Sequence, residues 1–326
     1  MKALLCTQHG DPEDLVLTEL ADPIAGPGEV VVRIAAAGVN YPDTLTIRDL
    51  YQFKPELPFA PGGEASGVVE AVGEGAGLSV GDRVIAFLGS DGGFAEKAVV
   101  DARRCLPVPD AMPLDDAAAF VFAHSTSQHA LIQRGEAKAG ETLLVLGAGG
   151  GVGLAAVEIG HVLGLRVVAA ASSAEKLAAA REAGADETID YASQDLRSAM
   201  KELGGADIVY DPVGGDYAEP ALRSMNWLGR YLVVGFPAGI PKFPANLALL
   251  KGCDIRGVFW GRFTEVQPAE HFANLAQLTQ WYLAGDVKPR ISARYPLAEG
   301  GRALRAMMDR KAVGKLLVEV DPSLYA

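Results

Sequence analysis

The pattern of hydrophobic and polar positions changes character near residue 115. Before that point, short β-branched runs alternate with Gly- and Pro-rich clusters. The runs fall at residues 30–34, 67–69, 83–85 and 98–100. Short apolar runs bounded by turn residues are typical of an antiparallel barrel or sandwich. The first 120 residues are therefore predicted to form a β-rich domain.

Beyond residue 115, apolar runs alternate with helical segments. Helical patterning covers residues 115–122 and 125–134. Six apolar runs then predict strands at residues 142–147, 166–171, 187–190, 207–211, 230–236 and 255–260. One intervening helix is expected from an N-cap at Ser173 to a terminating glycine at Gly184, and another over residues 216–226. Buried strands that alternate with helices predict an α/β domain, a doubly wound parallel sheet of six strands.

The last part of the chain returns to the first domain in this prediction. Two helices are expected at about residues 268–284 and 298–310, followed by a final strand at residues 315–320. We therefore predict that residues 1–121 and 262–326 form one domain. Residues 122–261 form the other, inserted between them.

A glycine-rich segment follows the first strand of the predicted parallel sheet. It comprises Gly147, Ala148, Gly149, Gly150, Gly151 and Val152, and an apolar helix begins within it. The spacing fits GxxGxxG at Gly147, Gly150 and Gly153. Glycine lets the backbone turn tightly and approach a pyrophosphate, which the free N–H groups of the helix N-terminus then bind. No Gly-Lys-Ser/Thr follows, which excludes a P-loop. The segment predicts a dinucleotide site.

The end of the second strand indicates which dinucleotide is bound. NAD enzymes place an acidic residue there for the ribose hydroxyls. This chain instead has Ser172 and Ser173, with Lys176 one turn into the next helix. Hydroxyls, a helix N-terminus and a lysine suit a 2′-phosphate. Tyr191, after the third strand, is expected to close the same pocket. The sequence therefore favours NADPH over NADH.

Composition narrows the class of protein. The net charge of −12 opposes nucleic-acid binding, which depends on Lys and Arg contacts to phosphate. The three cysteines, Cys6, Cys105 and Cys253, are widely spaced and include no CxxC, so neither a zinc site nor a disulfide framework is indicated. The apolar stretch 143–157 is too short to span a bilayer. A cytoplasmic enzyme with reduced thiols is expected.

Several motifs along the whole chain match one family. They are Ala37-Gly38-Val39-Asn40, residues 57–62, 66–69 and 80–84, the glycine loop, Asp211-Pro212-Val213-Gly214-Gly215, residues 233–236 and Gly314-Lys315-Leu316. With them the chain resembles the zinc-free quinone oxidoreductases, the zeta-crystallin-like branch of the medium-chain dehydrogenase/reductase superfamily. The resemblance implies a GroES-like barrel domain and a Rossmann domain, with the active site in the cleft between them.

The resemblance also indicates whether the chain binds a catalytic zinc ion. Zinc enzymes of this superfamily carry a Cys where this chain has Asn40, and a His where it has Gly63. Glu64 remains, but one carboxylate does not replace the three protein ligands of a catalytic zinc. The five histidines show no metal-like pairing and are expected at the surface or at helix ends. No metal is predicted. Without a Lewis acid, an activated acceptor such as a quinone or a conjugated enone is favoured.

The resemblance assigns roles to individual residues. Asn40 and Tyr51 are the expected hydrogen-bond donors to the acceptor, and both are predicted as catalytic. A second tyrosine found in part of the family is missing, because Leu45 and Thr46 occupy that region. Contacts to the nicotinamide side of the cofactor are expected from Thr126, Phe236, Phe259 and Trp260. Lys315 either approaches the cofactor or is a salt-bridging strand end. A homodimer through the edge strand 255–260 is expected.

Three functions remain open at this stage. The first is an NADPH-dependent quinone oxidoreductase without metal. The second is an NADPH-dependent enone or 2-enoyl thioester reductase on the same scaffold, since the chemistry is nearly identical and the acceptor pocket decides. The third is a non-catalytic protein that binds NADPH or RNA, although the charge of −12 counts against RNA.

Overall fold

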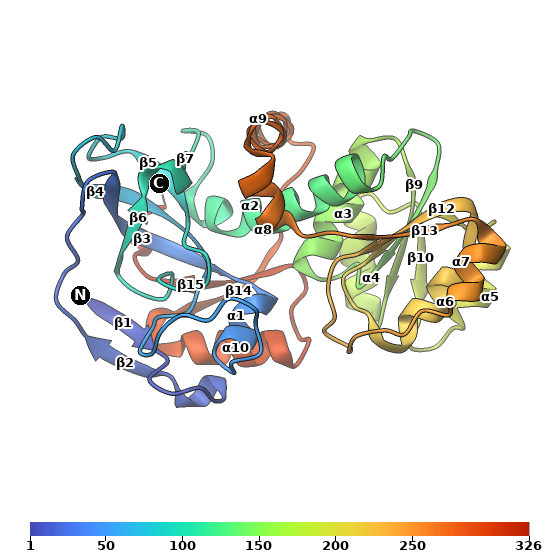
Figure 1. Cartoon of the computed structure of the whole chain (residues 1–326), viewed down its shortest axis with the longest axis horizontal. Coiled ribbons are helices and arrows are strands. Elements are labelled where there is room, and N and C mark those ends of the chain that lie inside the picture. The colour runs from blue at the N-terminus through green and yellow to red at the C-terminus, as the bar shows by residue number, and fades with distance from the viewer. Residues whose placement is uncertain (326) are drawn as a thin grey trace. The chain divides into compact units, whose positions relative to one another are not determined.

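The computed structural model describes residues 1–325, which divide into two compact units. The first unit contains Met1–Val121 and the chain from Pro289 onward, and the second contains Phe122–Lys288. Each unit has its own sheet (Figure 1). Each also has its own hydrophobic core. Among the described residues, no helix combines the length and the apolar character needed to cross a membrane.

The first unit is built on a seven-stranded sheet with the order β14-β15-β3-β4-β5-β7, in which β6 also pairs with β3. Its strands are β3 (Glu29–Val39), β4 (Glu64–Val72), β5 (Arg83–Phe87), β6 (Lys97–Asp101), β7 (Cys105–Pro107), β14 (Ile291–Pro296) and β15 (Lys315–Glu319). All pairs are antiparallel except β14 with β15. The β-rich prediction for this part of the chain is confirmed.

Shorter elements complete the first unit. Strands β1 (Lys2–Leu5) and β2 (Val16–Glu19) form a separate hairpin. Helix α1 (Tyr41–Thr46) follows β3 directly, and α10 (Gly300–Met308) packs against α1. The core gathers the inward side chains of the strands, such as Val32, Ile34 and Leu316, with Phe94 and Leu304.

The second unit is a six-stranded parallel sheet with the order β10-β9-β8-β11-β12-β13. Its strands are β8 (Thr142–Leu146), β9 (Arg166–Ala171), β10 (Glu187–Asp190), β11 (Ala206–Asp211), β12 (Met225–Val233) and β13 (Asp254–Gly257). The order reverses at β8, as in a Rossmann fold. The doubly wound prediction is confirmed. The long apolar runs arise because both faces of the central strands are covered.

Helices cover both faces of this sheet. On one face, Gly160 of α3 (Gly151–Val162) lies against Leu143 and Val167. The opposite face, carrying Leu144 and Leu146, packs on α5 (Leu196–Glu202), α6 (Ala218–Arg223) and α7 (Ala245–Lys251). Helix α4 (Ala174–Glu182) begins after an N-cap at Ser173, whose hydroxyl accepts from the Lys176 amide, and Gly184 follows it with φ 103°. That helix was predicted with these ends.

The predicted domain boundary at residue 262 differs from the structure. Residues 262–288 lie in the second unit, where α8 (Trp260–Val266) and α9 (Pro268–Ala284) pack near α2 (Leu114–His129). The His129 ring stacks on Phe263 at 4.0 Å, and the Gln133 and Asn274 amides exchange hydrogen bonds. The sequence shows an amphipathic helix at 268–284, but its periodicity does not reveal which domain it covers.

Three smaller predictions also differ. The expected strand 255–260 ends at Gly257, and helix α8 begins at Trp260. The helix expected over 216–226 stops at Arg223, because Met225 already pairs with Ala206 of β11. The two helices expected at 115–122 and 125–134 are one helix, α2, which continues into a π-helical turn at Ala130–Arg134.

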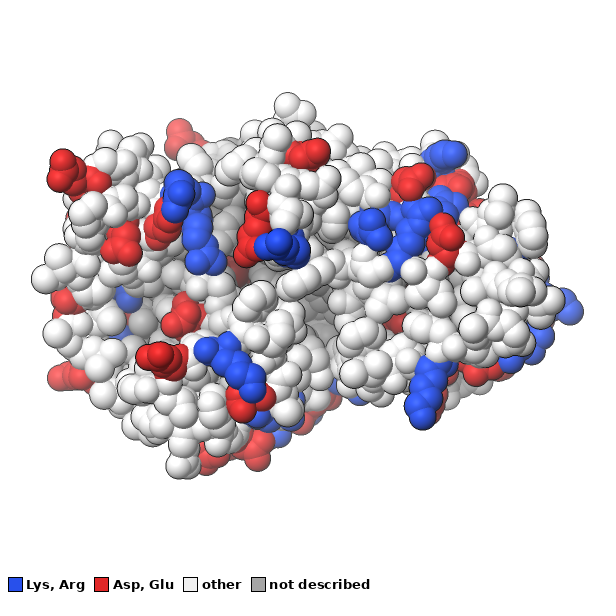
Figure 2. All heavy atoms as spheres, in the orientation of Figure 1, with Lys and Arg blue, Asp and Glu red and all other residues white. Residues whose placement is uncertain are grey.

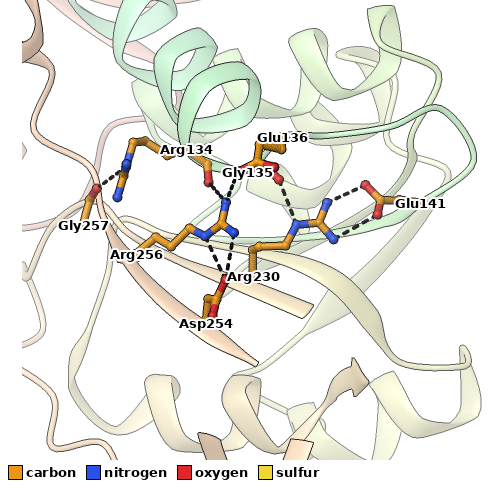
Figure 3. Close-up of polar contacts among 8 residues, drawn as sticks. All are labelled: Arg134, Gly135, Glu136, Glu141, Arg230, Asp254, Arg256 and Gly257. Atoms are coloured by element: carbon orange, nitrogen blue, oxygen red, sulfur yellow. Dashed lines mark hydrogen bonds and ion pairs between the residues drawn. The ribbon is translucent and has the colours of Figure 1, made fainter. Parts of the chain in front are cut away.

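Arginine side chains tie this π-helical turn to the outer strands of the second sheet (Figure 3). Arg134 Nε donates to the Gly257 carbonyl at 2.9 Å, and Arg256 donates to the Arg134 carbonyl and to Glu136. Arg230 pairs with Glu141 at 2.6 Å and donates to the Gly135 carbonyl. These contacts fix the end of α2 against β12 and β13.

The histidines are placed differently from the prediction. His9 and His161 are exposed, but His124, His129 and His271 are buried in the second unit. His124 Nε2 lies 2.9 Å from a Glu158 carboxylate oxygen. Burial lowers the pKa of His271 to about 4, so its ring is neutral at physiological pH. The helices α2 and α9 bury these rings as packing residues.

Candidate cofactor and active site

The glycine loop of the second unit is shaped by close backbone approaches. Gly147 follows β8 directly with φ 59°, and Gly150 is the N-cap of α3. A Cβ on Gly153 would lie 2.2 Å from the Gly147 carbonyl oxygen, so α3 packs directly on the turn. Gly150 has only ordinary contacts around its missing Cβ. The loop therefore leaves the N-terminus of a 12-residue helix open to an anion.

The tip of β9 lies beside this loop. A Cβ on Gly149 would come within 2.5 Å of the Lys176 side chain, so the stem of this lysine lies against the glycine loop. Ser172 is exposed, and Ser173 caps α4. Tyr191 follows β10, and its amide donates to Ala171 at the end of β9. The four residues predicted for the 2′-phosphate thus gather at the carboxyl ends of two adjacent strands.

The turn after β11 forms the other side of the loop. Asp211 Oδ1 accepts from the amides of Val213 and Gly214, each at 2.8 Å, and the Tyr231 hydroxyl donates to Oδ2 at 2.6 Å. A Cβ on Gly147 would meet the Val213 side chain at 2.6 Å. Asp211 therefore holds the turn against the glycine loop. The sequence showed Asp211 as part of a family motif but did not reveal this role.

Residues predicted for the nicotinamide side differ in exposure. Phe236 and Phe259 are 40% and 46% exposed. Trp260 is buried, with its ring 5.4 Å from Phe122 and 5.7 Å from His271. Its indole therefore packs inside the second unit rather than at the surface. Thr126 is buried, and its hydroxyl donates to the Phe122 carbonyl of its own helix at 2.7 Å.

In the first unit, three strand ends bring polar side chains together. Leu316 pairs with Val39 and Ala65 with Ala37, so the residues just beyond these pairs meet. They are Asn40 at the end of β3, Glu64 at the start of β4 and Lys315 at the start of β15. Lys315 Nζ lies 2.7 Å from Asn40 Oδ1 and 3.2 Å from Glu64 Oε2. All three side chains are buried.

This contact fixes the carboxamide of Asn40. Because an ammonium group only donates, the oxygen of Asn40 faces Lys315. The Nδ2 group donates to the Gly38 carbonyl and to Glu64 Oε2, each at 3.2 Å. Both amide protons are therefore engaged within the first unit. Lys315 has the strand-end ion pair that was one of its two predicted roles.

Asp43 joins the same cluster from helix α1. Its Oδ2 accepts from the Asn40 amide at 2.7 Å and its Oδ1 from the Gly63 amide at 3.3 Å. Burial raises the pKa of Asp43 from 3.8 to about 7, although the Asn40 hydrogen bond and the charge of Lys315 oppose the shift. The Asp43 carboxyl therefore ties the Asn40 turn to the Gly62–Gly63 turn.

Tyr51 is the other predicted catalytic residue. Its ring makes an edge-to-face contact with Phe53 at 5.7 Å. Burial, followed by the charge of Asp43, raises the pKa of its hydroxyl, which stays protonated and able to donate. Within residues 1–325, its hydroxyl makes no hydrogen bond to a protein group. It is the predicted donor whose polar group remains available to a ligand.

Metal ligands and thiols are the remaining groups that could carry chemistry. Within the part of the chain that the structure describes, no group of three His, Cys, Asp or Glu residues could hold a metal ion. The three cysteines are free and buried, and burial raises the pKa of each thiol, that of Cys105 to about 11.

On the face drawn in Figure 2, basic side chains lie interspersed with acidic ones.

Comparison with known proteins identifies the family. Residues 26–110 match the model of the alcohol dehydrogenase GroES-like domain, and residues 151–277 match that of the zinc-binding dehydrogenases. The mouse quinone oxidoreductase-like protein 2 is 36% identical over 325 residues, which cover 98% of this chain and 92% of the mouse protein. The chain belongs to the quinone oxidoreductase-like, zinc-free branch of the medium-chain dehydrogenase/reductase superfamily. It is an oxidoreductase.

Solved structures of quinone oxidoreductases are similar to this chain over nearly its whole length. The quinone oxidoreductase from Thermus thermophilus, described with its NADPH complex, is 34% identical with a TM-score of 0.87, over 98% of this chain and 100% of that one. The Escherichia coli quinone oxidoreductase complexed with NADPH is 27% identical with a TM-score of 0.92, over the same shares of both chains. The name of the second family model mentions zinc, but its match, residues 151–277, is what this chain shares with that family and says nothing of a bound metal.

Proposed function

We propose that the protein is an NADPH-dependent quinone oxidoreductase that transfers a hydride to a quinone without a metal. The observation that carries the proposal is the glycine loop with Lys176 lying against Gly149, at a strand tip that ends in Ser172 and Ser173 rather than in a carboxylate. The NADPH complexes of the Thermus and Escherichia coli relatives support the choice of cofactor.

The residues of the second unit fit this cofactor. The glycines leave room for a pyrophosphate at the N-terminus of α3, which a Cβ on Gly150 would occupy. Ser172, Ser173, Lys176 and Tyr191 would hold the 2′-phosphate by charge-assisted hydrogen bonds. Phe236 and Phe259 offer exposed aromatic surface at the carboxyl end of the sheet. When bound, NADPH supplies a hydride, which is a proton and two electrons.

The first unit supplies the polar groups for the acceptor. The hydride and one proton from solvent convert a quinone to its hydroquinone, so the oxygen that gains negative charge needs a donor. In our proposal the Tyr51 hydroxyl donates to that oxygen, an effect of about 3 kcal/mol for a well-placed donor. Asn40 lies in the turn before α1, where Lys315 and Glu64 hold its amide. Delocalisation of the charge in a quinone makes a Lewis acid unnecessary.

The test is steady-state oxidation of NADPH and of NADH against a benzoquinone, an alkenal, an enone and a crotonyl thioester. We expect the highest kcat/KM for the quinone with NADPH. A preference for the enone or the thioester would replace the quinone reductase proposal with an ene-reductase. Preference for NADH would contradict the role of Lys176. Tight NADPH binding without turnover of any acceptor would favour a non-catalytic protein.

Two variants test the cofactor assignment and the donor assignment separately. Lys176→Met removes a charged hydrogen bond and is expected to raise KM for NADPH about ten-fold or more, with little change for NADH. The exposed Lys201→Met serves as its control. Tyr51→Phe is expected to lower kcat about ten-fold or more without changing the affinity for NADPH. Unchanged kinetics in both variants would contradict the assignments.

A further inference from the structure

A buried ammonium group lies where three strands of the first unit end. Lys315 is only 3% exposed, and a Cβ on Gly38 would come within 3.2 Å of its Nζ and 2.9 Å of Glu64 Oε2. The same Cβ would lie 2.2 Å from the Ala118 carbonyl oxygen, so glycine at position 38 lets the backbone pass close to this cluster. Such burial of a lysine is rare unless the charge is paired, as it is here with Glu64.

Lys315 completes the set of contacts that fixes the orientation of Asn40. The two ends of a carboxamide are nearly the same size, so its hydrogen bonds decide which way it faces. Gly38 and Glu64 accept from Nδ2, and Lys315 donates to Oδ1. Without Lys315, Oδ1 loses this donor and that end of the carboxamide is released.

The hydrogen bonds continue from Asn40 to the residues before Tyr51. The backbone N–H of Asn40 donates to the Asp43 carboxylate in α1. The amides of Arg48 and Leu50 both donate to the Leu45 carbonyl, which closes the turn after the helix. The segment from residue 40 to residue 50 is therefore one hydrogen-bonded piece, anchored at its start by Lys315.

We propose that Lys315 is a positioning residue of the reductase, which fixes the Asn40 carboxamide and thereby the segment 40–51 that presents the Tyr51 hydroxyl. The inference rests on the proposed function for its kinetic consequence. Asn40 is then a support rather than a donor to the acceptor. Lys315, at the start of β15, provides the cation that pairs with Glu64 in this cluster.

The kinetic experiment compares Lys315→Met and Glu64→Gln with the double variant Lys315→Met/Glu64→Gln, because Glu64 also accepts from Asn40 Nδ2. The Lys315→Met single variant removes the cation that pairs with the buried Glu64 carboxylate and is expected to lower the melting temperature strongly. The double variant removes that charge and is expected to recover most of the melting temperature, but to keep kcat at least about ten-fold below the wild type. Affinity for NADPH, followed by its fluorescence, should not change. Lys311→Met, at an exposed position nearby in sequence, is the control.

A second measurement does not depend on activity. The asparagines of the chain are Asn40, Asn226, Asn246 and Asn274, so selective ¹⁵N labelling gives a readable set of side-chain amide signals. We expect slow solvent exchange for the Asn40 amide protons in the wild type and fast exchange in the double variant. Asn274, which is buried in the second unit, should not change in either protein.

The two measurements separate the possible failures. A double variant with wild-type kcat, or with unchanged Asn40 signals, would overturn the positioning role. Loss of kcat together with release of the Asn40 amide would support it. If the wild type itself reduces no acceptor while the Asn40 signals respond as expected, the proposed function fails and the structural role of Lys315 stands.

Discussion

Asp43 carries a buried carboxyl whose charge state changes near neutral pH. Burial favours the protonated form in the folded protein, so the pKa of Asp43 rises from 3.8 to about 7. A carboxyl with a raised pKa binds its proton more tightly in the folded state than in the unfolded state. Its contribution to stability is therefore fully present below about pH 4 and is lost as the pH rises through about 7.

Replacement of Asp43 by Asn should remove this pH dependence. We expect the free energy of unfolding of Asp43→Asn to improve relative to the wild type between pH 5 and pH 8, by at most about 4 kcal/mol. Urea denaturation at several pH values measures the difference. The exposed Asp110→Asn is the control, and its curve should run parallel to that of the wild type. Parallel curves for Asp43→Asn would show that Asp43 does not titrate in this range.

At the residue scale, the sequence identified the side chains of the candidate site but not which of them contact one another. Asn40, Tyr51 and Lys315 were all singled out from motifs. That Lys315 holds Asn40 was not predicted, because the two residues lie 275 positions apart and meet through the register of β15 on β3. A one-residue shift of that register would turn Lys315 to the other face of the sheet. Motifs do not encode such non-local register.

At the scale of elements, two glycines of the strand–loop–helix in the second unit serve different purposes. One is required for packing, and the other is expected to make room for the ligand. Gly153 is needed for packing, because a Cβ there would meet the Gly147 carbonyl at 2.2 Å. Gly150 is not needed for packing, because the atom nearest to a Cβ at this position would be 3.5 Å away. If the loop cradles a pyrophosphate, Gly150 is instead needed for the ligand.

The two glycines should therefore respond differently to alanine. Gly153→Ala is expected to lower the free energy of unfolding by at least about 2 kcal/mol, because backbone atoms must move. Gly150→Ala should cost less than about 1 kcal/mol, yet weaken NADPH binding about ten-fold or more. Urea denaturation and NADPH fluorescence titration measure the two quantities. Wild-type affinity in Gly150→Ala would contradict a dinucleotide site at this loop.

Local patterns predicted most elements but not all of their ends. Helix α9 was predicted at 268–284 because its apolar positions and its terminal glycine are both local signals. Helix α8 was missed, since Val258, Phe259 and Trp260 extend the apolar run of β13 and read as strand. What ends the strand is tertiary, because Trp260 packs on Phe122 and His271. Contacts of this kind override propensity.

At the scale of the whole molecule, β13 is the exposed edge of the second sheet. It is the last strand in the order, and among residues 1–325 it pairs only with β12. The Arg134 side chain donates to the Gly257 carbonyl on this edge. The Ile255 side chain, in the same strand, is 39% exposed. The strand is short and carries Asp254 and Arg256 beside Ile255, but its unpaired edge still offers backbone groups that can pair with another chain. The predicted homodimer through this edge therefore remains our expectation.

A charge on this edge should separate the subunits. We expect light scattering to give twice the chain mass of 34.1 kDa for the wild type and the single chain mass for Ile255→Glu. The control is Val80→Glu, which adds the same charge at a more exposed apolar position in the first unit. A monomeric wild type would contradict the dimer. A dimeric Ile255→Glu would place the interface elsewhere, and the Arg134 contact would then act as protection of the edge against pairing.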